Sequence, residues 1–301
     1  MEPYHGALVA ITLILWSTLY PAVRRTTLVR AWAWGLFAAA VMFVLTAGRP
    51  LVRLDPSFSA AVALGVSLTP FLARLGAKRP QYRAWDFIVA SFLLVLFGAV
   101  LAVMARGRSD HLPSLFQIVM AVGIAMQWFD NVLTPGVVAA TLFGTAQILL
   151  LGTASGYWSA DAGTAVWSLQ VVACALVVRR YYLGPAPPRG WHGVWQSFRN
   201  RYGVLWSLRV RERCNADAER AAWPWRLTWD GWVHITPQEH PTSAPVDEPS
   251  PDDGAAGALE NAELDPVVAR AFRHVLQRFV EPAWIDERIE PRTERSGEEF
   301  S

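Results

Sequence analysis

In the apolar first half of this sequence nearly all ionisable residues lie at the ends of long apolar segments, and the sharpest local cluster of polar residues there occupies residues 127–131. It reads Gln-Trp-Phe-Asp-Asn and is followed shortly by a proline. A carboxylate flanked by two amides could line a polar pocket at a membrane boundary, with Gln127, Asp130 and Asn131 as candidate residues. The alternative is a turn at which Asp130 pairs with an arginine of a neighbouring loop.

Three glutamines inside successive apolar segments form a second candidate set, an intramembrane polar path made of Gln117, Gln147 and Gln170. No apolar segment carries Asp, Glu, Lys or Arg at its centre. A carrier coupled to protons or ions usually needs such a group, because ionisable residues inside a membrane mark ion pathways. The glutamines therefore indicate either hydrogen bonds between helices or a substrate path.

Motifs for catalysis or metal binding are missing from the sequence. It contains no phosphate-binding loop, dinucleotide fingerprint, HExxH or GxSxG pattern. Six histidines are scattered without ligand spacing, and the two cysteines, Cys174 and Cys214, are too few for a structural zinc site. We therefore expect no metal ion and no cofactor, name no catalytic residue, and favour a non-enzymatic role without excluding an enzyme.

The elements that must position these side chains follow from the uneven composition of the chain. Residues 1–183 contain 19 charged side chains, whereas residues 184–301 contain 33. A bilayer core of about 30 Å requires about 20 apolar residues in a helix. Seven segments qualify, so we expect an all-α polytopic membrane protein with a bundle of seven transmembrane helices over residues 1–183. The predicted spans are 5–23, 28–47, 58–75, 85–105, 112–129, 133–152 and 162–178.

The connections between these segments predict the orientation, since cytoplasmic loops carry an excess of Lys and Arg. Nine such residues fall on one side of the predicted bundle and four on the other. We expect a protein of the bacterial cytoplasmic (inner) membrane with its N-terminus outside and its C-terminus in the cytoplasm. The nine residues are Arg24, Arg25, Arg30, Arg74, Lys78, Arg79, Arg83, Arg179 and Arg180.

An aromatic and basic stretch follows the last apolar segment and is the centre of a predicted juxtamembrane module, residues 184–235. Residues 191–232 hold seven tryptophans and seven arginines. A helix over about 193–222 carries aromatic residues along one face. The pair Asp230-Gly231 between two alternating runs predicts a β-hairpin.

This aromatic face has two interpretations: it lies among lipid headgroups, or it packs inside a small soluble module. We do not expect nucleic-acid binding, because a position beside the membrane already accounts for basic residues among aromatics. The candidate contacts to the membrane surface or to a partner are Trp191, Trp195, Arg199, Arg201, Arg209, Phe272 and Phe279.

The rest of the chain is predicted to be a tethered helix between unstructured segments. Residues 236–263 are rich in Pro, Ala and acidic residues, and such a composition predicts a disordered linker. An amphipathic C-terminal helix is expected within 264–290, with Phe272 and Phe279 in its apolar stripe, followed by a disordered tail over 291–301. The helix either docks on the protein itself or engages a cytoplasmic partner.

Taken together, these patterns favour a non-enzymatic anchor or assembly protein that presents a cytoplasmic module. The first alternative is a transporter of a small molecule or lipid, and the second is an intramembrane enzyme acting on lipid. The expected partners are the lipid bilayer and a cytoplasmic protein. Small residues at four-residue spacing, Gly136, Ala140 and Gly144, favour packing within the bundle, with a homo-oligomer as the alternative.

Overall fold

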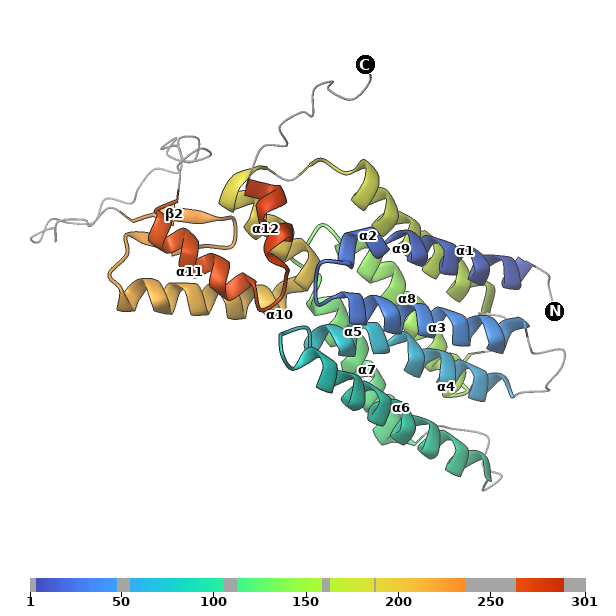
Figure 1. Ribbon diagram of the computed structural model, residues 1–301. Coiled ribbons are helices and arrows are strands. Elements are labelled where there is room, and N and C mark those ends of the chain that lie inside the picture. Colours follow the sequence, from blue (N-terminus) through green and yellow to red (C-terminus); the bar gives the residue numbers. More distant parts are fainter. Residues whose placement is uncertain are drawn as a thin grey trace, which may run out of the picture. The chain divides into compact units, whose positions relative to one another are not determined.

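The computed structural model describes residues 4–47, 55–105, 113–158, 163–186, 188–235 and 264–289 (Figure 1). The chain divides into two compact units. The first comprises Met1–Pro185 together with Tyr202–Val204, and the second comprises Ala186–Arg201 and Leu205–Ser301. The predicted linker over 236–263 and the predicted tail over 291–301 lie outside the described residues.

Helices make up the described part of the first unit, and their apolar composition matches the expected bundle. In chain order they are α1 (Tyr4–Thr18), α2 (Tyr20–Val23), α3 (Val29–Ala47), α4 (Pro56–Ser67), α5 (Thr69–Leu75), α6 (Tyr82–Ala105), α7 (Ser114–Phe129), α8 (Val137–Ala154) and α9 (Gly163–Leu183).

Among the described residues, four helical segments are long and apolar enough to cross a membrane. They are Pro56–Leu75, Tyr82–Ala102, Val137–Ala154 and Gly163–Leu183. The other three predicted spans form shorter apolar helices, Ala7–Val23, Val29–Leu45 and Ser114–Phe129. The count of seven spans is therefore not confirmed, although every predicted span corresponds to an apolar helix.

Two of the predicted spans contain a break next to a proline. Pro21 lies in the first turn of α2 and Pro70 in the first turn of α5, directly after α1 and α4. Proline lacks an N–H and is tolerated best in the first turn of a helix, so a new helix begins there. At the start of α4 the Asp55 carboxylate accepts hydrogen bonds from the backbone N–H groups of Ser57 and Phe58, at 2.8 and 3.2 Å.

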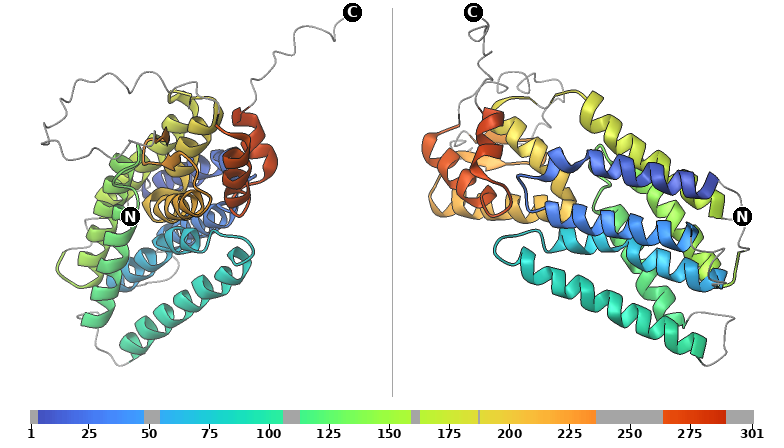
Figure 2. Two further views of the ribbon diagram at one scale, coloured as in Figure 1. Left: turned by 90° about the vertical axis from the view of Figure 1, so that its left-hand side faces the viewer. Right: turned by 45° about the vertical axis from the view of Figure 1, so that its right-hand side comes forward.

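Helix α8 is central to the packing of the first unit, because it contacts α4, α7 and α9. Helices α1, α3 and α4 run side by side (Figure 2). The shared core uses small residues for close approach: Ala60, Ala61 and Ala63 of α4 are buried, and Gly144 of α8 faces Ile124 of α7. Large apolar side chains such as those of Phe87 and Leu94 project outward instead, as lipid-facing residues do.

The second unit contains the expected helix and hairpin. Helix α10 covers Gly190–Arg220, and strands β1 (Trp225–Leu227) and β2 (Trp232–His234) pair antiparallel with Leu227 opposite Trp232. The backbone N–H of Thr228 donates to the Gly231 carbonyl at 2.8 Å and closes the turn. The small two-stranded sheet is thus confirmed where Asp230-Gly231 predicts it.

The C-terminal helix begins at Pro266, after Asp265, whose carboxylate accepts from the backbone N–H of Val267 at 2.7 Å. This helix, α11 (Pro266–Leu276), is followed by α12 (Pro282–Ile289). An ion pair of 2.7 Å between Arg273 and Asp286 joins the two helices. Phe272 of α11 and Phe279, which follows α11, pack against aromatic rings of α10, and Trp284 of α12 lies against Arg201 of α10. The apolar stripe of the C-terminal helix is thus buried inside this chain.

Candidate functional site

A buried ion pair in the first unit brings together residues far apart in the sequence. Asp130 follows the end of α7, and Arg74 lies in the last turn of α5. Arg74 Nη2 donates to Asp130 Oδ2, and the two side chains are only 17% and 2% exposed. Arg74 Nη1 also donates to Asn131 Oδ1 at 3.4 Å. The carboxylate of the predicted polar group is thus held by an arginine at the end of α5.

The remaining members of this polar group support the turn after α7. Asn131 Nδ2 donates to the Gln127 carbonyl oxygen at 2.8 Å, and the Thr134 hydroxyl donates to the Asn131 carbonyl at 2.9 Å. Gln127 and Asn131 are half-buried, and Asp130 is buried. The structure therefore brings all three candidate residues together, in a turn stabilised by local hydrogen bonds.

Three residues of α10, Tyr202–Val204, belong to the first unit and complete the polar cluster. The backbone N–H of Val204 donates to the Asp130 carbonyl oxygen at 2.9 Å. The Tyr202 hydroxyl lies 3.1 Å from Thr27 Oγ1, which donates to the Ala77 carbonyl at 2.5 Å. We call Thr27, Arg74, Asp130, Asn131 and Tyr202–Val204 the Asp130 cluster.

Gly203 interrupts α10 where it meets the Asp130 cluster. Its φ of 79° and ψ of −175° are not helical and fall in a region that is nearly restricted to glycine. A Cβ at this position would lie 2.5 Å from Asp130 Oδ2 and 2.7 Å from the Asp130 carbonyl oxygen. Both the backbone angles and the close approach require glycine here.

Tyr202, Gly203 and Thr27 were not among the candidate site residues predicted from the sequence. One indication of this contact was present in the sequence, a glycine inside a long helical pattern, because such a glycine often allows close approach of another segment. The arrangement at Asp130 is that of a structural joint. The buried Asp130 carboxylate pairs with Arg74 at the end of α5, and the Asp130 carbonyl oxygen accepts from Val204 after the break in α10.

The predicted intramembrane glutamines differ in burial. Gln147 and Gln170 are fully buried, whereas Gln117 is half-buried. Gln147 Nε2 donates to Ser67 Oγ at 3.0 Å and to Gln127 Oε1 at 3.4 Å. Hydrogen bonds between helices are therefore present at Gln147, which links α8 to α4 and α7.

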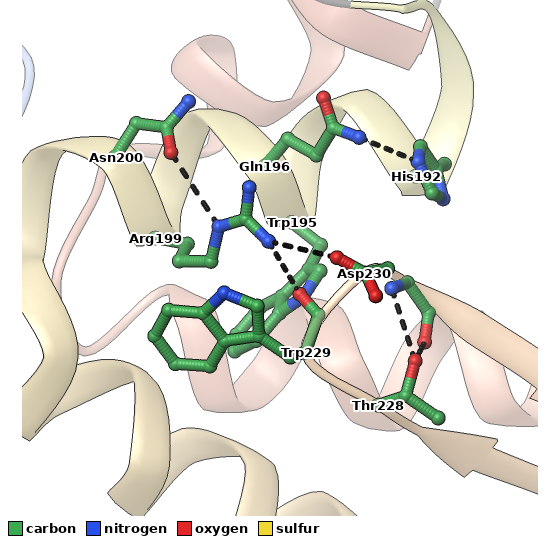
Figure 3. A network of polar contacts seen from close by, with 9 residues as sticks. His192, Trp195, Gln196, Arg199, Asn200, Thr228, Trp229 and Asp230 are labelled. Atoms are coloured by element: carbon green, nitrogen blue, oxygen red, sulfur yellow. Dashed lines mark hydrogen bonds and ion pairs between the residues drawn. The ribbon is translucent and has the colours of Figure 1, made fainter. Parts of the chain in front are cut away.

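In the second unit, Arg199 fastens the hairpin turn to α10 (Figure 3). Its Nη1 donates to the Trp229 carbonyl at 2.7 Å and lies 3.5 Å from the Asp230 carboxylate. The guanidinium is 5.1 Å from the centroid of the Trp229 ring. Burial lowers the pKa of Arg199, and the neighbouring Asp230 opposes that shift. Trp195 Nε1 donates to the same Trp229 carbonyl at 2.9 Å.

The other predicted contact residues of the second unit are mostly engaged within it. Trp195, Phe272 and Phe279 are buried, and Trp191 is half-buried with its ring centroid 5.8 Å from that of Phe272. The Arg201 guanidinium lies over Trp284 and that of Arg209 over Trp206, at 5.7 and 5.1 Å. Of the seven candidates, Arg209 alone is exposed.

A shallow groove of about 580 Å³ lies between the C-terminal half of α10 and the hairpin. Asn215 at its floor donates to the Leu227 carbonyl and accepts from the Leu227 backbone N–H, at 3.0 and 2.8 Å. Arg226 and Glu219 form an ion pair of 2.8 Å across it. Within the described ranges no group of three or more His, Cys, Asp or Glu residues could hold a metal ion.

Comparisons with known proteins leave the chain without a family assignment. No protein-family model, no curated protein and no solved structure matches it. We therefore infer the function from the chemistry of the described residues.

Proposed function

We propose that the protein is a non-enzymatic membrane anchor that presents its folded C-terminal module to a cytoplasmic protein partner. The observation that carries this proposal is the Asp130 cluster. Residues Tyr202–Val204 belong to the bundle unit, although the chain on both sides of them belongs to the module. The chain thus returns to the bundle unit within the module, which suits a protein that carries the module on a membrane anchor, because a passive tail needs only a linker.

The proposed topology has seven spans, with the N-terminus outside and the module in the cytoplasm of a bacterial cell. The excess of Lys and Arg in the corresponding connections supports this orientation. Outward-facing apolar side chains on the shorter helices support their contact with lipid, among them Ile14 of α1, Val44 of α3 and Leu115 of α7. Short spans are accommodated by local thinning of the bilayer.

Photo-crosslinking in native membranes tests the anchor proposal. A photoreactive residue at Val267 on α11 or Val233 on β2, both exposed, is expected to give a discrete protein adduct. The same residue at Leu94 of α6, an outward-facing position in the bundle, should give lipid adducts only. The proposal fails if neither module position gives a protein adduct while the Leu94 position reacts with lipid.

A small-molecule or lipid transporter is the second candidate, favoured by the full burial of Gln147 and Gln170 in the bundle. Polar side chains inside a membrane bundle mark substrate paths as well as helix contacts. Under this function, Gln147→Leu should lower uptake in vesicles while the amount of folded protein is unchanged. Uptake equal to that of empty vesicles for the unmodified protein would remove the transporter from consideration.

A further inference from the structure

Gln147 and Gln170 lie at the same depth in the first unit. Helices α8 and α9 pack together and are joined by a short connection after Ala154, so they run antiparallel. Gln147 is seven residues before the last residue of α8, and Gln170 is seven residues after the first residue of α9, Gly163. At a rise of 1.5 Å per residue, each lies about 10 Å from the connected helix ends.

Both glutamines face the same apolar core. Ala146 and Leu150, beside and one turn from Gln147, belong to the largest cluster of buried apolar residues. Val166 and Trp167, one turn before Gln170, belong to the same cluster. Because residues three and four apart share a helix face, the two amides are directed into one interior region.

Polar atoms of these two amides lack partners within the described part of the chain. They are Gln147 Oε1, Gln170 Oε1 and Gln170 Nε2, all fully buried. An unpaired amide in an apolar interior is costly, and it is costlier in a membrane because the surrounding lipid supplies no hydrogen bond. Two acceptors and one donor amide at one depth match a guest that both donates and accepts.

We infer that Gln147 and Gln170 form an intramembrane binding site for a small, neutral, hydrogen-bonding guest, either water or a solute with a hydroxyl or amide group. The site offers dipoles and no charge, since α8 carries no Asp, Glu, Lys, Arg or His and the two arginines of α9, Arg179 and Arg180, lie near its end, more than two turns from Gln170. An ion would lose its hydration there without a counter-charge, so the guest is neutral. Water needs two to four polar partners, and the two amides can supply three.

This inference does not rest on the anchor function. It would supply the binding step of the transporter if the guest is a solute, and a structural water of the bundle if the guest is water. Water and a solute would make the same hydrogen bonds with the two amides. They differ in whether an added solute shifts the Gln170 signal.

The test is water-edited solid-state NMR of the full-length, uniformly ¹⁵N-labelled protein in lipid bilayers. The Gln170 signal is identified by its loss in Gln170→Leu, with Gln117→Leu as the matched control that leaves it in place. Backbone amides of Val166 and Ala173, which are buried on the same helix, serve as dry references.

We expect polarisation to pass from water to the Gln170 amide faster than to the dry references, or the Gln170 signal to shift as urea or glycerol is added. Fast transfer that urea and glycerol leave unchanged assigns the guest as water, and a saturable shift assigns it as a solute. Transfer as slow as that of Val166, with no shift in either solute, overturns the inference. The transfer and titration measurements use the unmodified protein, and the two variants serve only to assign the Gln170 signal.

Discussion

Each of the two units is stabilised internally by a different kind of contact. In the first unit small side chains allow close helix packing, and polar pairs such as Arg74 and Asp130 join separate helices. In the second unit large aromatic side chains form the core: Phe272 contacts three tryptophan rings at centroid distances of 5.2 to 6.4 Å. The hydrophobic effect can stabilise the second unit in water, whereas it contributes little between helices in lipid.

This contrast indicates that polar contacts contribute differently to the stability of the two units. In an apolar bundle, one buried ion pair fixes which segments meet, since leaving either partner alone is costly. In the module, arginines lie over aromatic rings and add to a core that apolar burial already stabilises. Destabilising variants of the first unit should therefore act by breaking polar pairs, and those of the second unit by removing buried aromatic side chains.

The largest expected effect on the first unit is that of Asp130→Ala. It leaves the buried Arg74 guanidinium without its carboxylate, which should cost about 3–5 kcal/mol of the free energy of unfolding. Thermal unfolding in detergent measures the loss. The matched control is Asp86→Ala, because the Arg30–Asp86 pair is 3.4 Å apart and partly exposed. The control should lose about 1 kcal/mol or less. Equal losses would contradict the larger stabilising contribution that we expect of the Asp130–Arg74 pair.

Phe272→Ala should cause a comparable loss confined to the second unit. Removing a fully buried phenylalanine typically costs about 3–5 kcal/mol. Limited proteolysis should then cleave the module while the bundle helices remain protected. Val267→Ala on the same helix is the control, because Val267 is 56% exposed and should leave the digestion pattern unchanged. Cleavage spread over both units would show that the two cores are not separate.

Gly203→Ala should have an intermediate effect at the break in α10. The backbone angles alone cost a non-glycine residue about 1–3 kcal/mol, and the added Cβ would approach Asp130 to 2.5 Å. Gly98→Ala on α6 is the control, since a Cβ there meets nothing within 4 Å. The control should be neutral or stabilising by up to about 1 kcal/mol. Thermal unfolding in detergent distinguishes the two, and a neutral Gly203→Ala would contradict the described geometry.

The smallest expected effect concerns Cys214 in the module. Burial, and to a lesser degree Asp217, raises the pKa of its thiol from 9.0 to about 12. Because the thiolate is the reactive form, Cys214 should resist maleimide at pH 8 in a Cys174→Ala background until the module unfolds. An added cysteine at the exposed Ala216 position should react at once. Rapid labelling of Cys214 under native conditions would contradict its burial.

The same raised pKa fixes the direction of the pH dependence. Between pH 9 and about 12 the unfolded chain releases the thiol proton that the folded module retains. The contribution of Cys214 to the free energy of unfolding is therefore present below pH 9 and is lost as the pH rises through this window. Comparing alkaline unfolding of the module with that of Cys214→Ala measures this contribution.

Local patterns were enough to predict most elements. Asp230-Gly231 indicated the hairpin, and Asp265 followed by Pro266 indicated the start of the C-terminal helix, because cap and turn chemistry depends on neighbouring residues. The breaks at Pro21 and Pro70 were missed because hydropathy over a whole segment outweighs one proline.

Only part of the candidate site could be predicted from the sequence. Asp130 and Asn131 stand out as polar residues beside an apolar run, and Arg74 was one of several loop arginines that could pair with the acid. Tyr202 and Thr27 are 175 residues apart, and no local pattern reports that they meet. The packing partner of Phe272 likewise depends on tertiary structure, which periodicity alone does not specify.

The central claim, a seven-span anchor with a cytoplasmic module, is tested most directly by locating the two termini in intact bacterial cells. An odd number of spans places the termini on opposite sides of the membrane, whereas the four long apolar helices alone would place them on the same side. Our account predicts that an N-terminal tag is accessible from outside and that a green fluorescent protein fused after Ser301 fluoresces in the cytoplasm. Both termini on one side of the membrane would contradict it.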